Sequence, residues 1–491
     1  MSATSFFHGV TVSLVDVGAR TIAIPSSSII GLVDIFEPDS FELSPLKSGD
    51  YSLGIDAIDG EGGVASEQVF DFTNINIKKD CKVVIGEKTF TATANCSGTE
   101  LAKAIVASGN TDNWTLSLVE NSKVKFTAKN VGLTDELVGY TTGELARANQ
   151  AVLINSKTEA VKNFGENSLI TKDLNAIFEQ SKAVVIAVGV KQGASLNETI
   201  SNIIGTTKAD GTRTGLQALL DGKSLYNAQP RLLTAPGWSA NLAVATAMNS
   251  LAEKLRAIAI VDTADGDYSN AIEYAKNFGS KRIYMVYPAV KYFDTNIGDY
   301  VSSPASPYVA GLFAKTDEAY GFWASPSNKE INGITGTTKQ VEFLDGDETC
   351  RANLLNNAFI TTIIRDDGYR LWGNRTLSAD QKWSFVTRVR TLDIVMDAIL
   401  YGHKWAVDRS ITKTYVKDVT EGLNNFMRDL RNQGAIINFE VYADPELNTA
   451  SQLEQGKVYW NIRFTDVPPA ENPIFRVEVT NQWLTEVLEN E

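Results

Sequence analysis

The stretch Ala183-Val-Val-Ile-Ala-Val-Gly-Val190 decides the fold, because it is a continuous apolar run of strand length. Further runs of this kind lie at residues 231–235, 257–262 and 282–287. Amphipathic stretches with helical spacing lie between them, as at residues 240–255 and 268–278. Apolar strands joined by helical crossovers are typical of a parallel or mixed sheet that helices cover on both faces. We therefore predict an α/β fold, α+β over the whole chain, with a mixed sheet at its core.

The chain is too long for one ordinary core, so two or three domains are expected from its 491 residues. Residues 49–149 form a unit with its own pattern. Strand pairs at 82–91 and 114–128 flank a short helix that the capping box Ser97-Gly-Thr-Glu100 opens. This pattern predicts a β-rich domain inserted into an α/β core, which then comprises residues 25–48 and 150–380.

The last third of the chain begins with two long amphipathic stretches, 383–406 and 411–432, and continues with strand patterns at 435–442 and 457–465. We predict a helical and β domain over residues 381–466. The side chains expected to face its core are Phe385, Val389, Leu392, Met396 and Ile399 on the first helix, and Tyr415, Val419, Leu423, Phe426 and Leu430 on the second.

Each end of the chain carries a strand pattern without a partner nearby in the sequence. In the N-terminal arm, residues 1–24, the side chains Val10, Val12 and Leu14 share one face of an extended strand. The C-terminal arm, residues 467–491, starts with a proline-rich linker. It then presents the apolar side chains Ile474, Phe475, Val477 and Val479. Such strands must pair with a distant segment or with another chain.

Composition excludes several classes of protein. A net charge of -14 and an isoelectric point near 4.9 argue against nucleic-acid binding, which needs clustered Lys and Arg. No apolar run approaches the roughly 18 residues of a membrane span, and the N-terminus has no signal-peptide pattern. We expect a protein made and assembled in the cytoplasm, without membrane insertion.

Motifs for catalysis and for cofactors are missing from the sequence. Three cysteines without a CxxC pair and two histidines, His8 and His403, leave few ligands for zinc. Residues 333–339 have the wrong spacing for a phosphate loop, residues 262–267 are out of register for a calcium loop, and no GxSxG occurs. We predict no catalytic residue, no metal and no cofactor.

Several stretches resemble the contractile tail sheath family, closest to the sheaths of P2-like phages. They appear in the family's order and cover residues 5–48 and 150–491. The stretches are Phe7-His-Gly-Val10, Thr199-Ile-Ser-Asn-Ile-Ile-Gly-Thr-Thr207, Ile331-Asn-Gly-Ile-Thr-Gly336, Ile364-Arg-Asp-Asp-Gly-Tyr-Arg-Leu-Trp-Gly-Asn-Arg-Thr376, and more weakly His403-Lys-Trp-Ala-Val-Asp408 and Val467-Pro-Pro-Ala-Glu-Asn472. Residues 49–149 depart from the short P2-like pattern.

The resemblance implies a structural subunit that stacks as hexameric rings around a tail tube and contracts to drive the tube through a host envelope. Its partners would be further copies of itself, the tail tube protein, and baseplate and tail terminator proteins. In the family, the two arms add strands to the sheets of neighbouring subunits. The inserted domain is expected on the outer surface, where it does not obstruct the tube.

Basic residues in and beside the second long helix suggest a surface for the tube, because the rest of the protein is acidic. These residues are Arg409, Lys413, Lys417 and Arg428. Ordinary solvated helix charges explain them equally well. The alternative function is a soluble α/β enzyme, a hydrolase or transferase with an appended β module, and only the alternating middle segment favours it.

Overall fold

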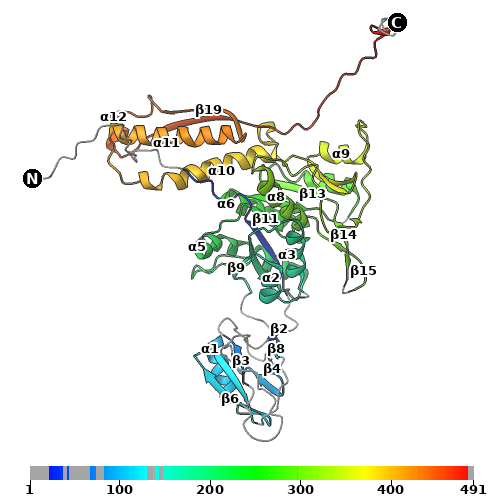
Figure 1. The fold of residues 1–491 in the computed structure, drawn as a ribbon, viewed down its shortest axis with the longest axis vertical. Coiled ribbons are helices and arrows are strands. Elements are labelled where there is room, and N and C mark those ends of the chain that lie inside the picture. The colour runs from blue at the N-terminus through cyan, green and yellow to red at the C-terminus, as the bar shows by residue number, and fades with distance from the viewer. Residues whose placement is uncertain are drawn as a thin grey trace, which may run out of the picture.

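The computed structural model describes residues 22–36, 41–43, 67–72, 82–94, 96–129, 137, 139–142, 148–166, 168–264, 266–295 and 297–484. Its largest sheet has eight strands in the order β18-β17-β13-β12-β11-β1-β10-β9 (Figure 1). The strands from β17 to β10 run parallel, and the edge strands β18 and β9 are antiparallel to their neighbours. The strands are β1 (Ile30–Ile35), β9 (Ala151–Ile154), β10 (Val185–Val190), β11 (Leu232–Thr234), β12 (Ile258–Asp262), β13 (Ile283–Tyr287), β17 (Ile360–Arg365) and β18 (Tyr369–Trp372). The predicted mixed sheet is confirmed.

Strand β1, which the sequence pattern above does not predict, lies between β10 and β11 near the centre of the sheet. All six of its residues are buried. Ile30 and Leu32 belong to the apolar cluster on one face of the sheet, whereas Val33 and Ile35 belong to the cluster on the other. This alternation is the period of two that a strand covered on both faces requires.

Helices cover both faces of the sheet. Apolar side chains of one set, α4 (Leu196–Ile204), α6 (Leu242–Leu255), α7 (Tyr268–Ala275) and α9 (Arg351–Asn357), join the first cluster. Those of α2 (Lys157–Phe164), α3 (Leu169–Gln180) and α8 (Ser306–Tyr320) join the second. A short helix, α5 (Gly222–Tyr226), lies beside the edge strand β9. The two layers of helices leave the sheet buried between them.

Two hairpins extend the α/β body. Strands β17 and β18 are joined by the turn around Gly368, whose φ of 112° suits glycine. The motif at residues 364–376 therefore contains the turn of this hairpin and its second strand. The second hairpin, β14 (Val290–Asp294) and β15 (Asp299–Ser303), follows β13 and forms a small sheet with β16 (Gly336–Thr337).

The C-terminal part contains α10 (Val386–Gly402), α11 (Lys413–Asn432), β19 (Ile436–Ala443), α12 (Ala450–Glu454) and β20 (Trp460–Asp466). The predicted inward stripe of α11 is confirmed: Val419, Leu423, Phe426 and Leu430 are buried and Tyr415 is half-buried. The stripe predicted for α10 is wrong in part, because only Val389 of its five residues is buried.

The buried face of α10 instead carries charged side chains that pair with the α/β body. Arg390 pairs with Asp317 of α8, Asp393 pairs with Arg282, and Asp397 pairs with Arg231 and Arg256. A pattern search that places charges outside cannot find this face. These ion pairs join the C-terminal helices to the sheet.

The β-rich unit lies at the opposite end of the molecule from α10 and α11 (Figure 1). Its own apolar cluster draws only on residues between 70 and 137. It contains two sheets, β2-β8-β4-β5 and β3-β7-β6, and the helix α1 (Gly98–Ala107), whose capping box is present: the Ser97 amide donates to Glu100 at 2.8 Å. The strands are β2 (Phe41–Leu43), β3 (Glu67–Asp71), β4 (Lys82–Ile85), β5 (Lys88–Thr91), β6 (Trp114–Val119), β7 (Lys123–Ala128) and β8 (Gly139–Thr142). Strand β2, which precedes the predicted boundary at residue 49, pairs with β8 and so belongs to this unit.

Candidate assembly surfaces

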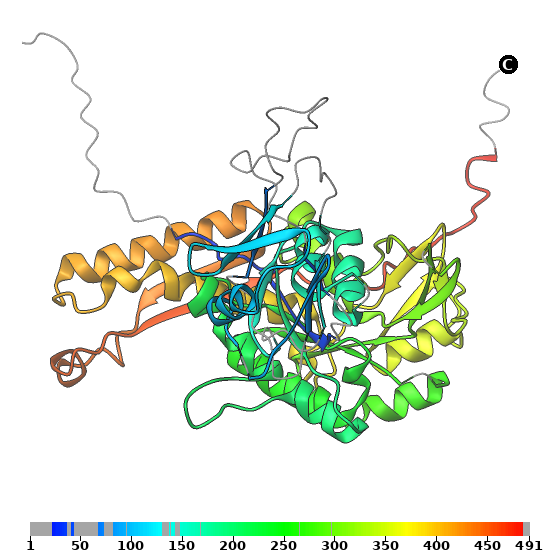
Figure 2. The ribbon, with the colours of Figure 1, turned by 90° about the horizontal axis from the view of Figure 1, so that it is seen from below.

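The C-terminal segment leaves the body after β20 and extends away from the side opposite α11 (Figure 2). Between residues 467 and 480 the described chain forms no strand. Ile474, Phe475, Val477 and Val479 are 78%, 86%, 88% and 97% exposed. Exposed apolar side chains in a row are rare on a monomer and mark a surface that another chain covers.

An ion pair fixes the base of this segment. Arg375 Nη2 donates to Glu471 Oε2 at 2.6 Å, and its Nε donates to Oε1 at 3.0 Å. The guanidinium lies 5.3 Å from the ring centroid of Phe359 and 5.3 Å from that of Phe385. Arg388 pairs with Asp466 at the end of β20, at 2.9 Å. The segment is therefore anchored up to residue 471.

The hairpin of β19 and β20 is a second surface. The two strands pair with each other, and within the described chain neither has a further strand on its other side. One face packs against α11 through half-buried side chains such as Phe439, Val441 and Trp460. Each strand thus presents an open edge of backbone donors and acceptors, which is a template for a strand from another chain.

The basic residues predicted to face the tube lie on the solvent side of α11 and just before it. Lys413, Lys417 and Arg428 are exposed and lie within about 60° of one another at 3.6 residues per turn. Lys417 is 3.6 Å from Glu421, and Arg428 donates to Asn425 at 2.8 Å. Arg409, in the loop before α11, lies over the Trp405 ring at 5.6 Å.

The N-terminal arm residues and the two histidines lie elsewhere, either outside the described residues or away from these surfaces. Val10, Val12, Leu14 and His8 precede residue 22, where the described residues begin. His403 ends α10, and its Nδ1 lies 2.8 Å from the carbonyl oxygen of Ile399, which is a packing role.

Buried carboxylates lie at the carboxyl ends of the parallel strands, where α/β enzymes place their sites. Asp34 is the penultimate residue of β1 and accepts from Trp238 Nε1 at 2.8 Å. Burial raises the pKa of Asp34 to about 6, and it raises the pKa of Asp173 well above its usual value because Asp34 is also close. No sequence pattern predicted the pairing of Asp34 with Asp173, because the two residues come from β1 and α3, which are far apart in the sequence.

These carboxylates serve the packing of the core. Asp262 accepts from the Ser306 hydroxyl at 2.6 Å and from the Gly237 amide at 3.1 Å, so it ties β12 to α8 and to the turn before α6. Asp34, Asp173 and Asp262 are 2%, 6% and 5% exposed. Groups so enclosed do not meet a substrate in this conformation.

Two other features are absent from the described residues. No helix among them has the length and hydropathy of a membrane span. No group of three or more His, Cys, Asp or Glu side chains among them is placed to hold a metal ion. Enclosed carboxylates, open strand edges and an exposed apolar arm together define a structural assembly protein.

Comparisons with known proteins identify the assembly. Residues 211–377 match the phage tail sheath protein central domain, and residues 378–480 match the phage tail sheath C-terminal domain. A prophage major tail sheath protein of Pseudomonas aeruginosa strain UCBPP-PA14 is 55% identical over 485 residues, 99% of each chain. The tail sheath protein of Escherichia phage P2 is 35% identical over 348 residues, 69% of this chain and 87% of that protein.

Solved structures with the same fold come from contractile particles. The helical sheath of the anti-feeding prophage in its contracted state has a TM-score of 0.58 at 18% identity and covers 97% of this chain and 99% of that one. A contracted sheath of an extracellular contractile injection system has a TM-score of 0.53 at 18% identity and covers 68% of this chain and 88% of that one.

The chain belongs to the contractile phage tail sheath family. It is a structural subunit of a contractile sheath and not an enzyme, and its place is a virion tail or a tail-like particle. The alternative of a hydrolase or transferase has no support in these comparisons.

Proposed function

We propose that this chain polymerises as stacked six-membered rings around a tail tube, is held extended by a baseplate, and contracts to drive the tube through the host envelope. The observation that carries the proposal is the exposed C-terminal segment, whose apolar side chains are 78–97% exposed beside a body with open strand edges. Baseplate and terminator proteins would bound the cylinder at its two ends. Assembly would take place in the host cytoplasm.

In this proposal the arms exchange between neighbouring subunits. Residues 474–479 of one copy add as a strand to an open edge of the β19–β20 hairpin in a neighbouring copy. The N-terminal strand that carries Val10, Val12 and Leu14 adds to the other open edge. Each added backbone hydrogen bond contributes about 1 kcal/mol net, and each large apolar side chain that becomes buried about 1.5–3 kcal/mol. A strand of five or six residues then holds two subunits together while their bodies rotate during contraction.

The division into domains would serve this assembly. The core of residues 25–48 and 150–380 and the domain of residues 381–466 form the wall, and the insertion at 49–149 lies on the outside. The placement of the β-rich unit at the end of the molecule opposite α11 supports this (Figure 1). The sheath of phage P2 matches 69% of this chain but 87% of its own length, which fits a shorter relative without an insertion.

The exposed basic face of α11 would contact the tube. Lys413, Lys417 and Arg428, with Glu421 among them, give this face a net positive charge in a chain of net charge -14. An acidic tube surface would then be held by contacts that salt weakens.

Co-assembly with purified tube protein at low salt tests the tube contact. Lys413→Glu with Lys417→Glu should abolish co-sedimentation of the sheath subunit with tubes. The control reverses two exposed lysines of the α/β body, Lys162→Glu and Lys208→Glu, and should leave co-sedimentation unchanged. Equal co-sedimentation of both variants would contradict a tube contact at α11.

A further inference from the structure

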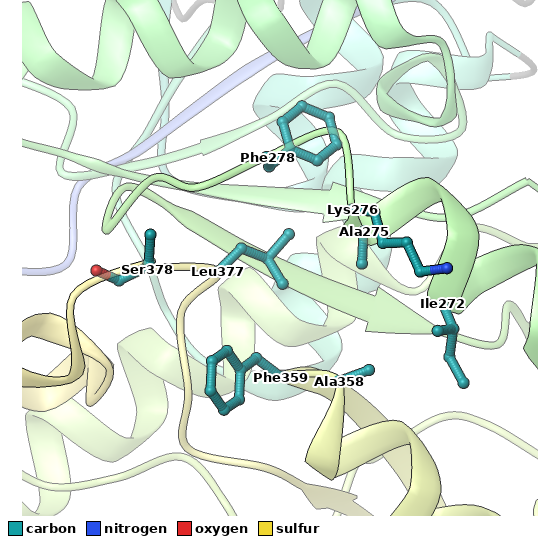
Figure 3. Close-up of a pocket in the computed structure, with 9 residues that line it drawn as sticks. Ile272, Ala275, Lys276, Phe278, Ala358, Phe359, Leu377 and Ser378 are labelled. Atoms are coloured by element: carbon teal, nitrogen blue, oxygen red, sulfur yellow. The ribbon is translucent and has the colours of Figure 1, made fainter.

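An apolar pocket of about 340 Å³ opens at the amino-terminal end of β13 and β17 (Figure 3). Its wall is made by Ile272, Phe278, Phe359 and Leu377, which come from α7, the turn after it, the turn before β17 and the chain after β18. Lys276 stands at the rim, and its side chain is 66% exposed. The volume lies in the range of about 300–1,000 Å³ that is usual for binding pockets.

An apolar projection lies at the other end of β13. The hairpin of β14 and β15 exposes Phe293 by 47%, Ile297 by 62% and Tyr300 by 64%. Phe293 and Tyr300 are cross-strand partners, and their rings meet edge to face with centroids 5.4 Å apart. The two rings thus hold each other in place, and Asp299 is exposed next to Tyr300.

The hairpin and the pocket of one copy cannot meet, because they lie at opposite ends of the same strand. β13 begins beside Leu377, whose amide donates to the carbonyl of Ile283 at 3.0 Å, and it ends at Tyr287, just before the hairpin. Five residues of strand span about 16 Å. Figure 1 shows α9, which precedes Phe359, above the hairpin β14–β15 on the same side of the body.

We propose that the hairpin tip of one copy inserts Phe293 and Tyr300 into this pocket of a second copy. The chemistry of the two surfaces matches: both are apolar, and the acidic Asp299 at the tip faces a pocket whose rim carries the cation of Lys276. Among the described residues, Lys276 pairs only with Glu273, at 2.6 Å, and a new partner can replace this exposed pair.

The position of the two surfaces explains why this contact suits a cylinder. A projection and a pocket that are different surfaces of one subunit make a head-to-tail contact, which each added copy repeats. Two rigid aromatic side chains, which bury about 150–250 Å² each, are typical of the residues that dominate an interface. The inference rests on the self-assembly in the proposed function and adds a contact between bodies that the arms do not make.

The test compares variants for growth of cylinders from the full-length chain, by sedimentation and negative-stain electron microscopy. Phe293→Ala with Tyr300→Ala should raise the concentration needed for cylinders about tenfold, as truncation of a central interface residue does. Ala379→Trp, which fills the pocket from its exposed rim, should do the same. The control Leu196→Ala removes another exposed side chain, 66% exposed on α4, and should have no effect.

A charge exchange identifies the pairing directly. Asp299→Lys and Lys276→Glu should each weaken assembly, and the variant with both changes should regain at least half of the lost assembly. Variants that all assemble as the unaltered chain does would overturn the contact and leave the proposed function intact. A loss with Ala379→Trp but not with the hairpin variants would also overturn it, since another segment would then fill the pocket. An unaltered chain that forms no cylinders would contradict self-assembly itself.

Discussion

Arg375 and Glu471 form a bidentate ion pair across 96 residues of sequence, with Nη2 to Oε2 at 2.6 Å. The pair joins two stretches that the sequence resemblance had singled out separately, residues 364–376 and residues 467–472. Arg375, which follows the β17–β18 hairpin in the chain, therefore anchors the C-terminal arm through Glu471. The direction in which the arm leaves the body is fixed at this point, and its exposed apolar side chains begin three residues later, at Ile474.

Removing the charge of Glu471 should release the base of the arm. A spin label at Ala470→Cys should report faster motion when Glu471→Gln is added, because Arg375 then loses its ionic partner. The matched control Glu478→Gln, an exposed change in the same arm, should leave the spectrum unchanged. Both pair residues are about a third exposed, so the free energy of unfolding should change by less than about 1 kcal/mol. An unchanged spectrum in Glu471→Gln would show that the pair does not hold the arm.

The pair of Arg390 and Asp317 should contribute strongly to stability, because both side chains are almost fully buried. Arg390 Nη1 donates to Asp317 Oδ1 at 2.8 Å, and the Ser27 hydroxyl donates to Oδ2 at 2.7 Å. Asp317→Asn leaves the buried guanidinium without its counter-charge and should cost about 3–5 kcal/mol in urea unfolding. As a control, Glu421→Gln breaks the exposed pair with Lys417 and should cost less than about 0.5 kcal/mol. Equal costs would contradict the role of the buried pair.

The raised pKa of Asp34 predicts a pH dependence of stability. The folded state holds this proton up to about pH 6, whereas the unfolded state releases it near the ordinary aspartate pKa of 3.8. The folded state therefore binds more protons between these values, and its stability falls as the pH rises through 6. We expect Asp34→Asn to reduce the loss of stability between pH 5 and pH 7.5 by about 1 kcal/mol, because only the step from pH 5 to about pH 6 falls within this window.

Urea unfolding of both proteins at the two pH values measures this difference. Asp210→Asn is the control, because Asp210 is exposed and its pKa is lowered, so it does not titrate in this window. A variant Asp34→Asn with the same pH dependence as the unaltered chain would rule out Asp34 as its source.

The β-rich unit should be dispensable for the cylinder. Because β2 pairs with β8, residues 41–142 can be replaced by a short Gly-Ser linker between neighbouring strand ends. We expect the shortened chain to form cylinders of smaller outer diameter and unchanged inner diameter, measured by electron microscopy. Loss of all cylinders, with the circular dichroism of a folded body, would place the unit in the wall of the sheath.

The sequence predicted best where patterns are local and one-sided. The runs at 183–190, 257–262 and 282–287 appear as β10, β12 and β13, and the apolar stripe of α11 is buried as expected. The buried face of α10 was not predictable in this way, because Arg390, Asp393 and Asp397 are buried by pairing with residues from distant segments. Strand β1 was missed because it is separated from its neighbour β10 by the whole insertion.

For the assembly surfaces, the sequence predicted the strand pattern and the basic residues but could not show what they contact. Ile474, Phe475, Val477 and Val479 read as a strand from sequence, yet the described chain gives them no strand partner. A strand needs a partner backbone, and one subunit does not supply it. Their pairing in neighbouring subunits, and the contact of Arg409, Lys413, Lys417 and Arg428 with a tube, remain predictions.

Negative-stain electron microscopy of the purified chain, intact and with its arms trimmed before Ala19 and after Pro473, tests the central claim most directly. We predict cylinders from the intact chain and none from either trimmed chain, since the exchanged strands hold neighbouring subunits together. Cylinders from the trimmed chains would contradict strand exchange, and small closed particles from the intact chain would contradict the assembly as a whole.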